Sequence, residues 1–270
     1  MNFLLTALTQ IIKKSPYRKF GISWLQEKII KHRTSIGPKK IKILGSAVSY
    51  LRDEEIIHCI KEIFFENSYD FQTSNQNPYI IDCGSHIGMS ILFFKKKYPN
   101  AVIKGFEPDK SNFQLLQKNI TEWGFCDVEI INQPVWNSEE DIIFEATGAM
   151  GGRIGSNSMQ SSHQYVLSPV KLSSQIDKKI DFLKIDIEGA EYEIIKDCED
   201  KLHLVQNLFI EFHSTFEEKY KLIEILNILD KCKFTFYIKE ANNIHPIPFN
   251  RKKIKSPFDI QLNIFAFRNS

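Results

Sequence analysis

The sequence predicts an α/β protein in which a doubly wound domain with a seven-stranded sheet follows an N-terminal helical arm. The chain has 270 residues of ordinary globular composition, which is enough to bury a sizeable core. From Tyr79 onward, short apolar runs alternate with helical patterns, as expected of a parallel sheet flanked by helices. Before Tyr79, apolar residues recur at helical spacing. We therefore expect an arm over residues 1–76 and the α/β domain over residues 77–270.

Helical periodicity and positive charge define the arm. Its periodic apolar residues are Phe3, Leu4, Ala7, Leu8, Ile11, Ile12, Ile56, Ile57, Ile60, Ile63 and Phe64. Residues 1–42 hold ten Lys and Arg against one acid, Glu27, so they carry +9 and the remaining chain carries 2 − 9 = −7. The first apolar run is about a dozen residues, short of the roughly 20 that cross a bilayer, and lacks the flanks of a secretory signal. We expect a soluble, cytoplasmic protein whose arm is solvated, contacts a membrane surface or forms a homodimer.

The cysteines indicate the same compartment. Cys59, Cys83, Cys126, Cys198 and Cys232 are odd in number, widely spaced and without a CxxC pair. They are expected to be free thiols of a reducing cytoplasm, with neither a disulfide framework nor a zinc site.

The elements of the domain follow in order along the chain. Strands are predicted over residues 79–82, 102–106, 128–132, 182–187, 208–212, 234–238 and 263–267. Helices are predicted between them over residues 90–97, 111–123, 190–198 and 217–232. A proline-containing loop without a clear helix separates the last two strands, so these are expected to pair as an antiparallel hairpin.

The turn after the first predicted strand has the composition of a cofactor-binding loop. Residues 77–90 read NPYIIDCGSHIGMS, in which Asp82, Gly84 and Gly88 lie between an apolar run and a helical pattern. Glycines at such a turn let the backbone approach a ligand and aim helix N-terminal N–H groups at it. The spacing differs from the GxGxxG of dinucleotide folds, and no Walker lysine motif is present. An acid just before the turn suits a ligand that carries an ammonium group.

Further positions complete the predicted cofactor site. The next strand ends in GFEPD, where Glu107 can accept hydrogen bonds from both hydroxyls of a ribose. Together with the glycine turn, which includes Ser85 and His86, this position points to S-adenosylmethionine. After the third strand, Asn132 and Gln133 either read an adenine edge or form a polar turn.

With these motifs the sequence resembles the FkbM family of S-adenosylmethionine-dependent methyltransferases. The matching pieces are IIDCGSHIGMS, GFEPDKSNFQLLQKNI, DFLKIDIEGAEYEIIKD, LFIEFH and NIFAFR, in the family's order over residues 79–267. The resemblance implies a Rossmann-like methyltransferase fold with an antiparallel last strand, and O-methylation of sugars or of polyketide-type and other glycosylated natural products. Ser85 and His86 stand where the family usually has a small residue followed by Asn, which puts the contact of that Asn in question.

Charged residues alternate along the strand predicted over residues 182–187. Lys184, Asp186 and Glu188 would share one face, although a central parallel strand is normally apolar on both faces. This face is therefore expected to open onto a substrate cleft beyond the carboxyl end of the sheet. Lys184 lies deeper in the strand and is expected to pair with a neighbouring carboxylate at the border of the substrate site.

The run LFIEFH repeats this pattern with Glu211 and His213 on one face. Methyl transfer to a hydroxyl needs a group that takes its proton, and His213 is the predicted general base because its ordinary pKa lies near 6.5. Asp186 or Glu188 is the substitute base, and Glu211 belongs to the same catalytic group. Glu191 is expected to complete the first turn of the next helix. These carboxylates are also of the type that holds Mg²⁺, and a metal is left open.

A Gly- and Ser-rich segment lies between Glu145 and Tyr165. A loop of that length inside a compact domain is usually functional or disordered. It is either a lid in which residues 148–158 close over the acceptor and Arg153 reaches an anionic group, or a plain surface loop.

Two other functions stay open. The basic arm favours a nucleic-acid methyltransferase, but DIEG stands where amino-methylating enzymes carry an NPPY-type element, so no nucleic-acid partner is expected. The second is a non-enzymatic module that uses a cofactor-binding fold at a membrane surface or in an assembly. The expected acceptor is a small molecule or a glycan, such as a sugar of a surface polysaccharide.

Overall fold

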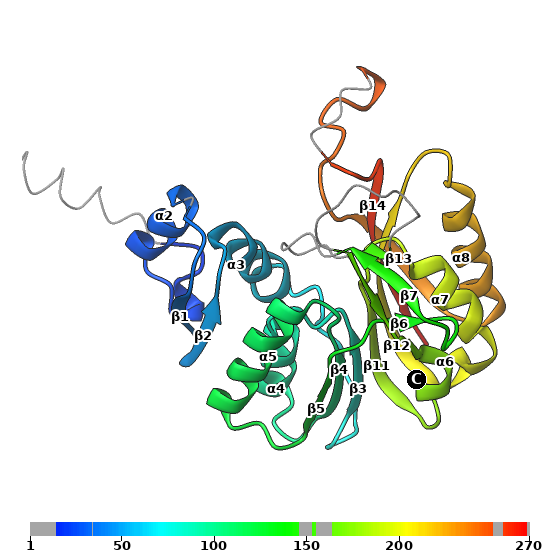
Figure 1. The fold of residues 1–270 in the computed structure, drawn as a ribbon, viewed down its shortest axis with the longest axis horizontal. Coiled ribbons are helices and arrows are strands. Elements are labelled where there is room, and N and C mark those ends of the chain that lie inside the picture. The colour runs from blue at the N-terminus through cyan, green and yellow to red at the C-terminus, as the bar shows by residue number, and fades with distance from the viewer. Residues whose placement is uncertain (1–14, 34, 146–152, 155–163, 251–255, 269–270) are drawn as a thin grey trace, which may run out of the picture.

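The computed structural model describes residues 15–33, 35–145, 153–154, 164–250 and 256–268 (Figure 1). The helical elements are η1 (Arg18–Phe20), α2 (Trp24–His32), α3 (Asp53–Cys59), the π-helix η2 (Ile60–Phe65), α4 (Met89–Lys97), α5 (Lys110–Trp123), α6 (Leu172–Gln175), α7 (Glu191–Cys198), η3 (Glu199–Leu204), α8 (Tyr220–Lys231) and η4 (Pro248–Asn250). The strands are β1 (Lys39–Ile43), β2 (Ser46–Tyr50), β3 (Tyr79–Cys83), β4 (Val102–Phe106), β5 (Val128–Ile131), β6 (Val135–Trp136), β7 (Ile142–Glu145), β8 (Arg153–Ile154), β9 (Gln164–Leu167), β10 (Val170–Lys171), β11 (Ile180–Ile185), β12 (Val205–Ser214), β13 (Thr235–Glu240) and β14 (Ile260–Phe267).

The central sheet has seven strands in the order β13-β14-β12-β11-β3-β4-β5. The strands from β12 to β5 are parallel to their neighbours, and β14 runs antiparallel to both β12 and β13. The predicted fold class is confirmed, including the antiparallel last strand and the hairpin that it forms with β13. This order brings the carboxyl ends of β3, β4, β11 and β12 to one edge of the sheet, where such folds bind ligands.

The strand predicted over residues 182–187 ends earlier, at Ile185. Glu188 and Gly189 then adopt left-handed backbone angles, with φ of 59° and 103°. The expectation that Glu188 continues the alternation of Lys184 and Asp186 is therefore wrong, because a turn and not a strand sets its direction.

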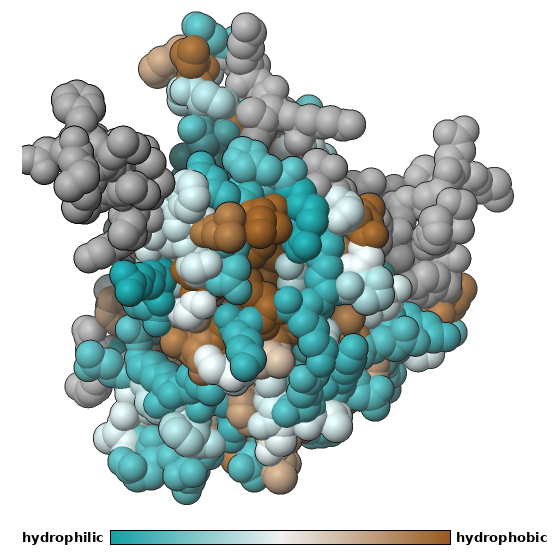
Figure 2. All heavy atoms as spheres, turned by 90° about the vertical axis from the view of Figure 1, so that its left-hand side faces the viewer, coloured by the Kyte–Doolittle hydropathy of each residue, from teal (hydrophilic) through white to brown (hydrophobic). Residues whose placement is uncertain are grey.

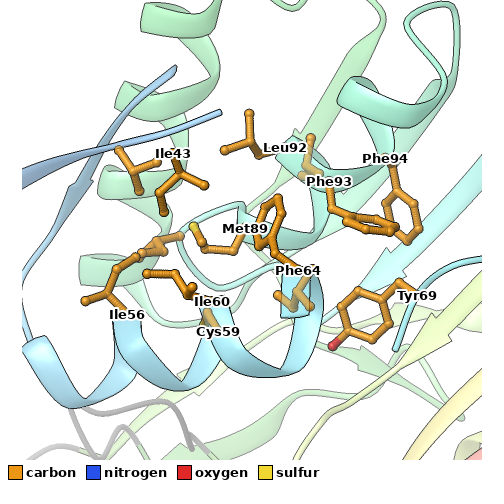
Figure 3. Close-up of a cluster of buried hydrophobic side chains, with 14 of the residues drawn as sticks. Ile43, Ile56, Cys59, Ile60, Phe64, Tyr69, Met89, Leu92, Phe93 and Phe94 are labelled. Atoms are coloured by element: carbon orange, nitrogen blue, oxygen red, sulfur yellow. The ribbon is translucent and has the colours of Figure 1, made fainter. Parts of the chain in front are cut away.

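Two hydrophobic clusters cover the two faces of the sheet. One cluster joins β11 and β12 to α6, α7 and α8 through residues such as Leu183, Ile194 and Leu229. The other joins the opposite face to α4, α5 and the residues before Tyr79. Figure 3 shows Ile56, Cys59 and Ile60 beside Met89 and Leu92 in this second cluster.

The segment before the sheet is not entirely helical. Residues 39–50 form an antiparallel hairpin of β1 and β2 with Leu44 and Gly45 at its turn. Both turn residues have positive φ, 49° and 82°, as two-residue hairpin turns require. Ile41 and Ile43 are buried, so the run KKIKI alternates as a half-buried strand does. The helical expectation is wrong here, whereas the helix expected around residues 56–64 is present as α3 and η2; the one expected around residues 3–12 lies outside the described residues.

Much of the positive charge of this segment is paired within the molecule. Arg33 and Lys39 both contact the buried carboxylate of Asp53, at 2.6 and 2.7 Å. Burial alone would raise the pKa of Asp53, but hydrogen bonds from these partners outweigh it and lower the pKa to about 2. Lys40 pairs with Glu122 of α5 at 2.8 Å. The basic residues therefore serve partly to hold the segment together and to attach it to helix α5.

Apolar side chains also reach the surface of this segment. Trp24, Leu25 and Ile29 of α2 are exposed. Figure 2, which faces this end of the molecule, shows an apolar area bordered by hydrophilic residues. No helix among the described residues is both long enough and apolar enough to cross a membrane.

Candidate active site

The turn between β3 and α4 brings the cofactor-loop residues against the end of β11. Gly84 and Gly88 have φ of 88° and 90°, which L-residues rarely adopt. A Cβ on Gly84 would lie 2.0 Å from the backbone oxygen of Asp186. A glycine is thus required at Gly84 both for its conformation and for the close approach of two chain segments.

Lys184 lies at the centre of the charged groups under this turn. Its side chain is 3% exposed, and Nζ donates to the Gly84 oxygen at 2.9 Å. The same Nζ lies 3.1 Å from Asp186 Oδ2 and 3.4 Å from Asp82 Oδ1. Burial alone would lower the pKa of Lys184, but the two carboxylates outweigh it and raise the pKa above its ordinary value. The expected carboxylate pairing is confirmed, and Lys184 fixes the geometry of the turn.

Glu107 contacts the turn from the end of β4. Its carboxylate accepts hydrogen bonds from the backbone N–H of His86 at 2.8 Å and of Asp109 at 2.9 Å. Burial raises its pKa to about 8, although these two bonds act in the opposite direction. The acid expected to bind a ribose therefore lies directly beside the glycine turn.

Ser85 and His86 have different environments within the turn. The Ser85 hydroxyl donates to the Asp82 backbone oxygen at 3.0 Å, which closes the turn. The two ring nitrogens of His86 are buried and make no hydrogen bond to any described residue. Nε2 lies 3.7 Å from Glu55 Oε2 on α3. Burial lowers the pKa of His86 to about 4, so the ring is neutral near pH 7.

Asn132 and Gln133 follow β5 and use their amides within the protein. Asn132 Nδ2 donates to the backbone oxygens of Glu107 and Pro108, at 2.8 and 3.2 Å. Gln133 Nε2 donates to the Ser168 oxygen at 2.8 Å. Asn132 thus holds the strand end that carries Glu107, whereas Gln133 attaches the segment before β10.

Carboxylates surround His213 at the end of β12. Nδ1 lies 3.1 Å from Glu191 Oε1, and Nε2 lies 3.4 Å from Glu211 Oε1 and 3.7 Å from Glu188 Oε2. Glu191 is fully buried and also accepts the backbone N–H of Gly189 at 2.9 Å. Glu191 was expected only to complete a helical turn, but the structure also places it as the residue that orients His213.

This surrounding charge changes the acid–base properties of the group. Burial alone would lower the pKa of His213, but Glu191 and Glu211 outweigh it and raise the pKa well above its ordinary value. Burial raises the pKa values of both Glu188 and Glu211 to about 7. The imidazole is therefore cationic at neutral pH, and a carboxyl group with a pKa near 7 is better matched to accept a proton than the His213 predicted from its unperturbed value.

An open pocket lies next to this group. Glu188 and His213 line it from the turn after β11 and from β12. Trp136 and Phe258 also line it, and the Phe258 ring centroid lies 4.9 Å from that of His213. No sequence pattern indicates these aromatic residues, because they come from β6 and the segment before β14 and have no motif in common.

Three ligand-type side chains meet at the same edge. Asp186, Glu211 and His213 each offer one atom, and these atoms lie within 4.8 Å of one another. A divalent cation or the proton of a cationic His213 can both satisfy such a group. Among the described residues, these three are the ones that could hold a metal.

Arg153 forms the short strand β8, with its backbone opposite Glu145 of β7. Its side chain, and all of residues 148–158 except 153 and 154, lie outside the part of the chain that the structure describes. The predicted lid and its arginine stay predictions.

The α3–η2 helix brings further polar residues to the site. Glu62 is 9% exposed, and its Oε2 lies 3.4 Å from His58 Nε2. Its Oε1 accepts a hydrogen bond from Asn263 Nδ2 of β14 at 3.3 Å. Asn263 is paired with Glu211 in the sheet register. Neither spacing nor motif in the sequence indicated that residues before Tyr79 would reach this edge.

The sheet order and the turns at its carboxyl edge define an α/β protein of the methyltransferase type. The family model described as the methyltransferase FkbM domain matches residues 82–236, which is more than half of the chain. The chain therefore belongs to the FkbM methyltransferase family.

Individual relatives agree with this assignment. Methyltransferase 1 of Beauveria bassiana (strain ARSEF 2860) is 26% identical over 182 residues, covering 58% of this chain and 72% of that protein. Methyltransferase sdnD of Sordaria araneosa is 27% identical over 187 residues, covering 56% and 72%. The solved FkbM methyltransferase of Methylobacillus flagellatus KT is similar in fold, with a TM-score of 0.50 at 15% identity over 77% of this chain. This chain covers 47%, about half, of that structure.

The residues at the turn fit S-adenosylmethionine. Asp82 Oδ1 and both His86 ring nitrogens are buried without a hydrogen bond to any described residue. Glu107 supplies a carboxylate of the kind that accepts hydrogen bonds from ribose hydroxyls. These residues are the ones that would hold the cofactor.

Proposed function

We propose that the protein is an S-adenosylmethionine-dependent O-methyltransferase that acts on a hydroxyl group of a carbohydrate or a glycosylated secondary metabolite. Membership of the FkbM family supports methyl transfer. The observation that carries the choice of a hydroxyl acceptor is the carboxylate–histidine group of Glu188, Glu211 and His213 at the border of an aromatic-lined pocket. Hydroxyl acceptors require removal of a proton, and this group is suited to accept one.

The cofactor supplies an electrophilic methyl group on a sulfonium. Glu188 lines the pocket, and its pKa of about 7 lets it accept the hydroxyl proton at neutral pH. The cationic His213 lies between Glu188 and Glu191 and keeps the accepting carboxylate in place. Trp136 and Phe258 offer ring faces, against which the apolar face of a sugar packs. Together these residues orient the acceptor oxygen and receive its proton.

Transfer of labelled methyl from S-adenosylmethionine to a panel of glycosides and glycosylated metabolites tests this proposal. We expect Glu188→Gln to lower kcat by about 10²- to 10⁴-fold, the usual contribution of a general base, with cofactor affinity unchanged. The wild-type rate should rise with pH through about 7, where Glu188 ionises, and level off above it. The variant should lack that rise.

Glu218→Gln is the matched control. Glu218 lines the same pocket, but its side chain is 47% exposed and pairs with Lys221 at 2.7 Å. Its variant should keep the wild-type kcat within about twofold, because an exposed ion pair contributes little. Full activity of Glu188→Gln, or transfer to a nitrogen atom instead of an oxygen, would contradict the proposal.

A nucleic-acid acceptor is the weaker candidate. Its support was the charge of residues 1–42, and Arg33, Lys39 and Lys40 of that segment are paired with carboxylates. Phosphate binding requires free basic groups and depends strongly on salt. Retention on RNA that falls steeply with added salt would favour that candidate.

A further inference from the structure

An exposed aromatic ring lies just outside the acceptor pocket. Phe216 comes shortly after the end of β12, and its neighbour Thr215 lines the pocket. Phe216 is 52% exposed, although its ring stacks on the His245 imidazole with centroids 5.4 Å apart and an interplanar angle of 22°. Since one face of the ring packs on His245, the opposite face is the one left for a ligand.

The sheet register brings this ring next to the wall of the pocket. Ser214 at the end of β12 pairs with Ile260 at the start of β14. The chain that continues from β12 therefore runs beside the segment before β14. Thr215 on the first and Phe258 on the second both line the pocket. Phe216 thus lies at the border of the pocket, on the side that faces away from the sheet.

Asp259 fixes these segments to one another. Its backbone N–H donates to the Ser214 oxygen at 2.9 Å, and its carboxylate accepts the backbone N–H of Phe216 at 3.2 Å. Its backbone oxygen accepts a hydrogen bond from His245 Nε2 at 3.0 Å. The stacked pair is therefore held in place before a ligand binds, so that binding has few side chains to order.

Polar groups between the rings indicate which kind of ligand suits this border. Trp136 and Phe258 line the pocket with rings, whereas Ser214, Thr215 and Glu218 line it with hydrogen-bonding groups. A sugar residue has an apolar face of C–H groups and a rim of hydroxyl groups, so it finds partners for both. An alkyl chain would cover the polar groups without replacing their hydrogen bonds to water, which is costly. The mixture of rings and polar groups favours a glycan.

We propose that Phe216 and His245 form a second sugar subsite, which binds the residue next to the one that is methylated. The proposal rests on the proposed function and narrows its acceptor class to an oligosaccharide or polysaccharide. The pocket with Glu188 receives the reacting sugar, and the neighbouring sugar of the same chain stacks on the free face of Phe216. This contact is the same in the ground state and the transition state, so it affects KM and not kcat.

Methyl transfer to acceptors of different length tests this subsite. The probes are the methyl glycosides of glucose, galactose, mannose and rhamnose, with the di- and trisaccharides that end in the same sugar. For the sugar that accepts methyl, we expect the wild-type KM to fall about tenfold from the glycoside to the disaccharide at unchanged kcat. Phe216→Ala should raise KM for the di- and trisaccharide by about tenfold, the effect of one lost stacked ring. Both constants for the single glycoside should stay unchanged.

Two further variants serve as controls. Phe216→Tyr should keep the wild-type preference for longer acceptors, because the face of the ring remains. Tyr237→Ala removes a ring that is 57% exposed on β13 and does not line the pocket, so it should behave as the wild type does. Binding of S-adenosylhomocysteine, measured by calorimetry, shows that each variant is folded.

Octyl glycosides of the same sugars distinguish a glycan from an apolar aglycone. If an octyl chain lowers KM as much as a second sugar does, and Phe216→Ala removes that gain, the sugar subsite is overturned. Equal KM values for short and long acceptors, or an equal effect of Phe216→Ala on both, would overturn it as well. Transfer to glycosylated metabolites but to none of these saccharides would overturn the subsite and leave the proposed function standing. No transfer to any of them would overturn both.

Discussion

At Glu107, the carboxyl group accepts two backbone N–H groups and is still shifted to a pKa of about 8 by burial. In the unfolded chain, the Glu107 carboxyl has its ordinary pKa of 4.5. Because the folded-state pKa is raised, this group's contribution to stability is fully present below about pH 4.5 and is lost as the pH rises through about 8. Ribose hydroxyls donate to the ionised form, so cofactor binding should draw the proton from Glu107.

We expect cofactor affinity to increase with pH for this reason. S-adenosylhomocysteine should bind about 20-fold more weakly at pH 6.5 than at pH 8.5, because protonated Glu107 must ionise first. Calorimetry at both pH values checks this, and buffers of different ionisation enthalpy report the released proton. The Glu107→Gln variant should bind weakly with no such dependence. A wild-type affinity that is independent of pH would contradict the assignment.

The charge of the group of Asp186, Glu211 and His213 can be balanced by a metal ion or by a proton on His213. Its ligand atoms are close enough for a metal, but the raised pKa of His213 means that a proton can supply the positive charge.

We expect methyl transfer to continue after treatment with EDTA, because the imidazolium already balances the neighbouring carboxylates. Activity before and after chelation, with Mn²⁺ added back, is the measurement. A loss of tenfold or more that Mn²⁺ restores would reassign these three residues as metal ligands.

Among the elements, the β3–α4 turn shows most clearly how backbone geometry specifies a residue. Gly84 and Gly124 both have positive φ, 88° and 68°, but a Cβ on Gly84 meets the Asp186 oxygen at 2.0 Å whereas one on Gly124 meets nothing within 4 Å. A side chain at Gly124 would meet only the cost of the left-handed backbone conformation, whereas one at Gly84 would also meet the steric clash with Asp186.

Gly124→Ala should lower the free energy of unfolding by about 1–2 kcal/mol, the cost of a left-handed conformation. Gly84→Ala should lower it by more than about 4 kcal/mol, because two backbone segments must move apart, and should abolish cofactor binding. Urea unfolding of both variants measures the difference. Equal effects would show that the Asp186 oxygen moves away without cost.

At the scale of the whole molecule, the residues before the sheet behave as part of the core. Tyr17, Phe20, Ile56 and Phe64 belong to one hydrophobic cluster with Phe94 of α4. The side chain of Asn119 connects the same layers, since it bonds the backbone of Ser49 in β2 and the Ile87 oxygen of the cofactor turn. The hairpin, α5 and the cofactor turn are thus linked through one buried amide.

Removing residues 1–76 should consequently expose this cluster and prevent stable folding of residues 77–270. We expect the truncated chain to aggregate, or to unfold more than about 10 °C below the full chain, in thermal unfolding followed by circular dichroism. Removal of residues 1–14 alone serves as the control and leaves the described cluster complete. An unchanged unfolding temperature for the chain without residues 1–76 would support an arm that is independent of the α/β domain, as the sequence pattern suggested.

Several features could be predicted from the sequence because their cause is local. The glycines at Gly84 and Gly88, the acid Glu107 after its strand and the alternation through Lys184 depend on spacing within one segment, and the strands predicted from apolar runs follow the same logic. The hairpin at residues 39–50 was missed although KKIKI alternates, because the surrounding helical periodicity dominated the prediction. Glu191 was assigned to a helix start, since its second contact, to His213, joins two segments.

The sequence by itself determined the α/β fold, the family and the residues at the ends of the strands, because each is encoded in short periodic runs and motifs. The tertiary structure alone decided which groups meet: Glu191 with His213, Lys184 with Asp82 and Asp186, and Glu62 with the cofactor turn. It also decided their protonation, since burial and neighbouring charges moved the pKa values of His213, Glu188 and Glu107. Both depend on contacts between residues far apart in the chain, which local patterns do not specify.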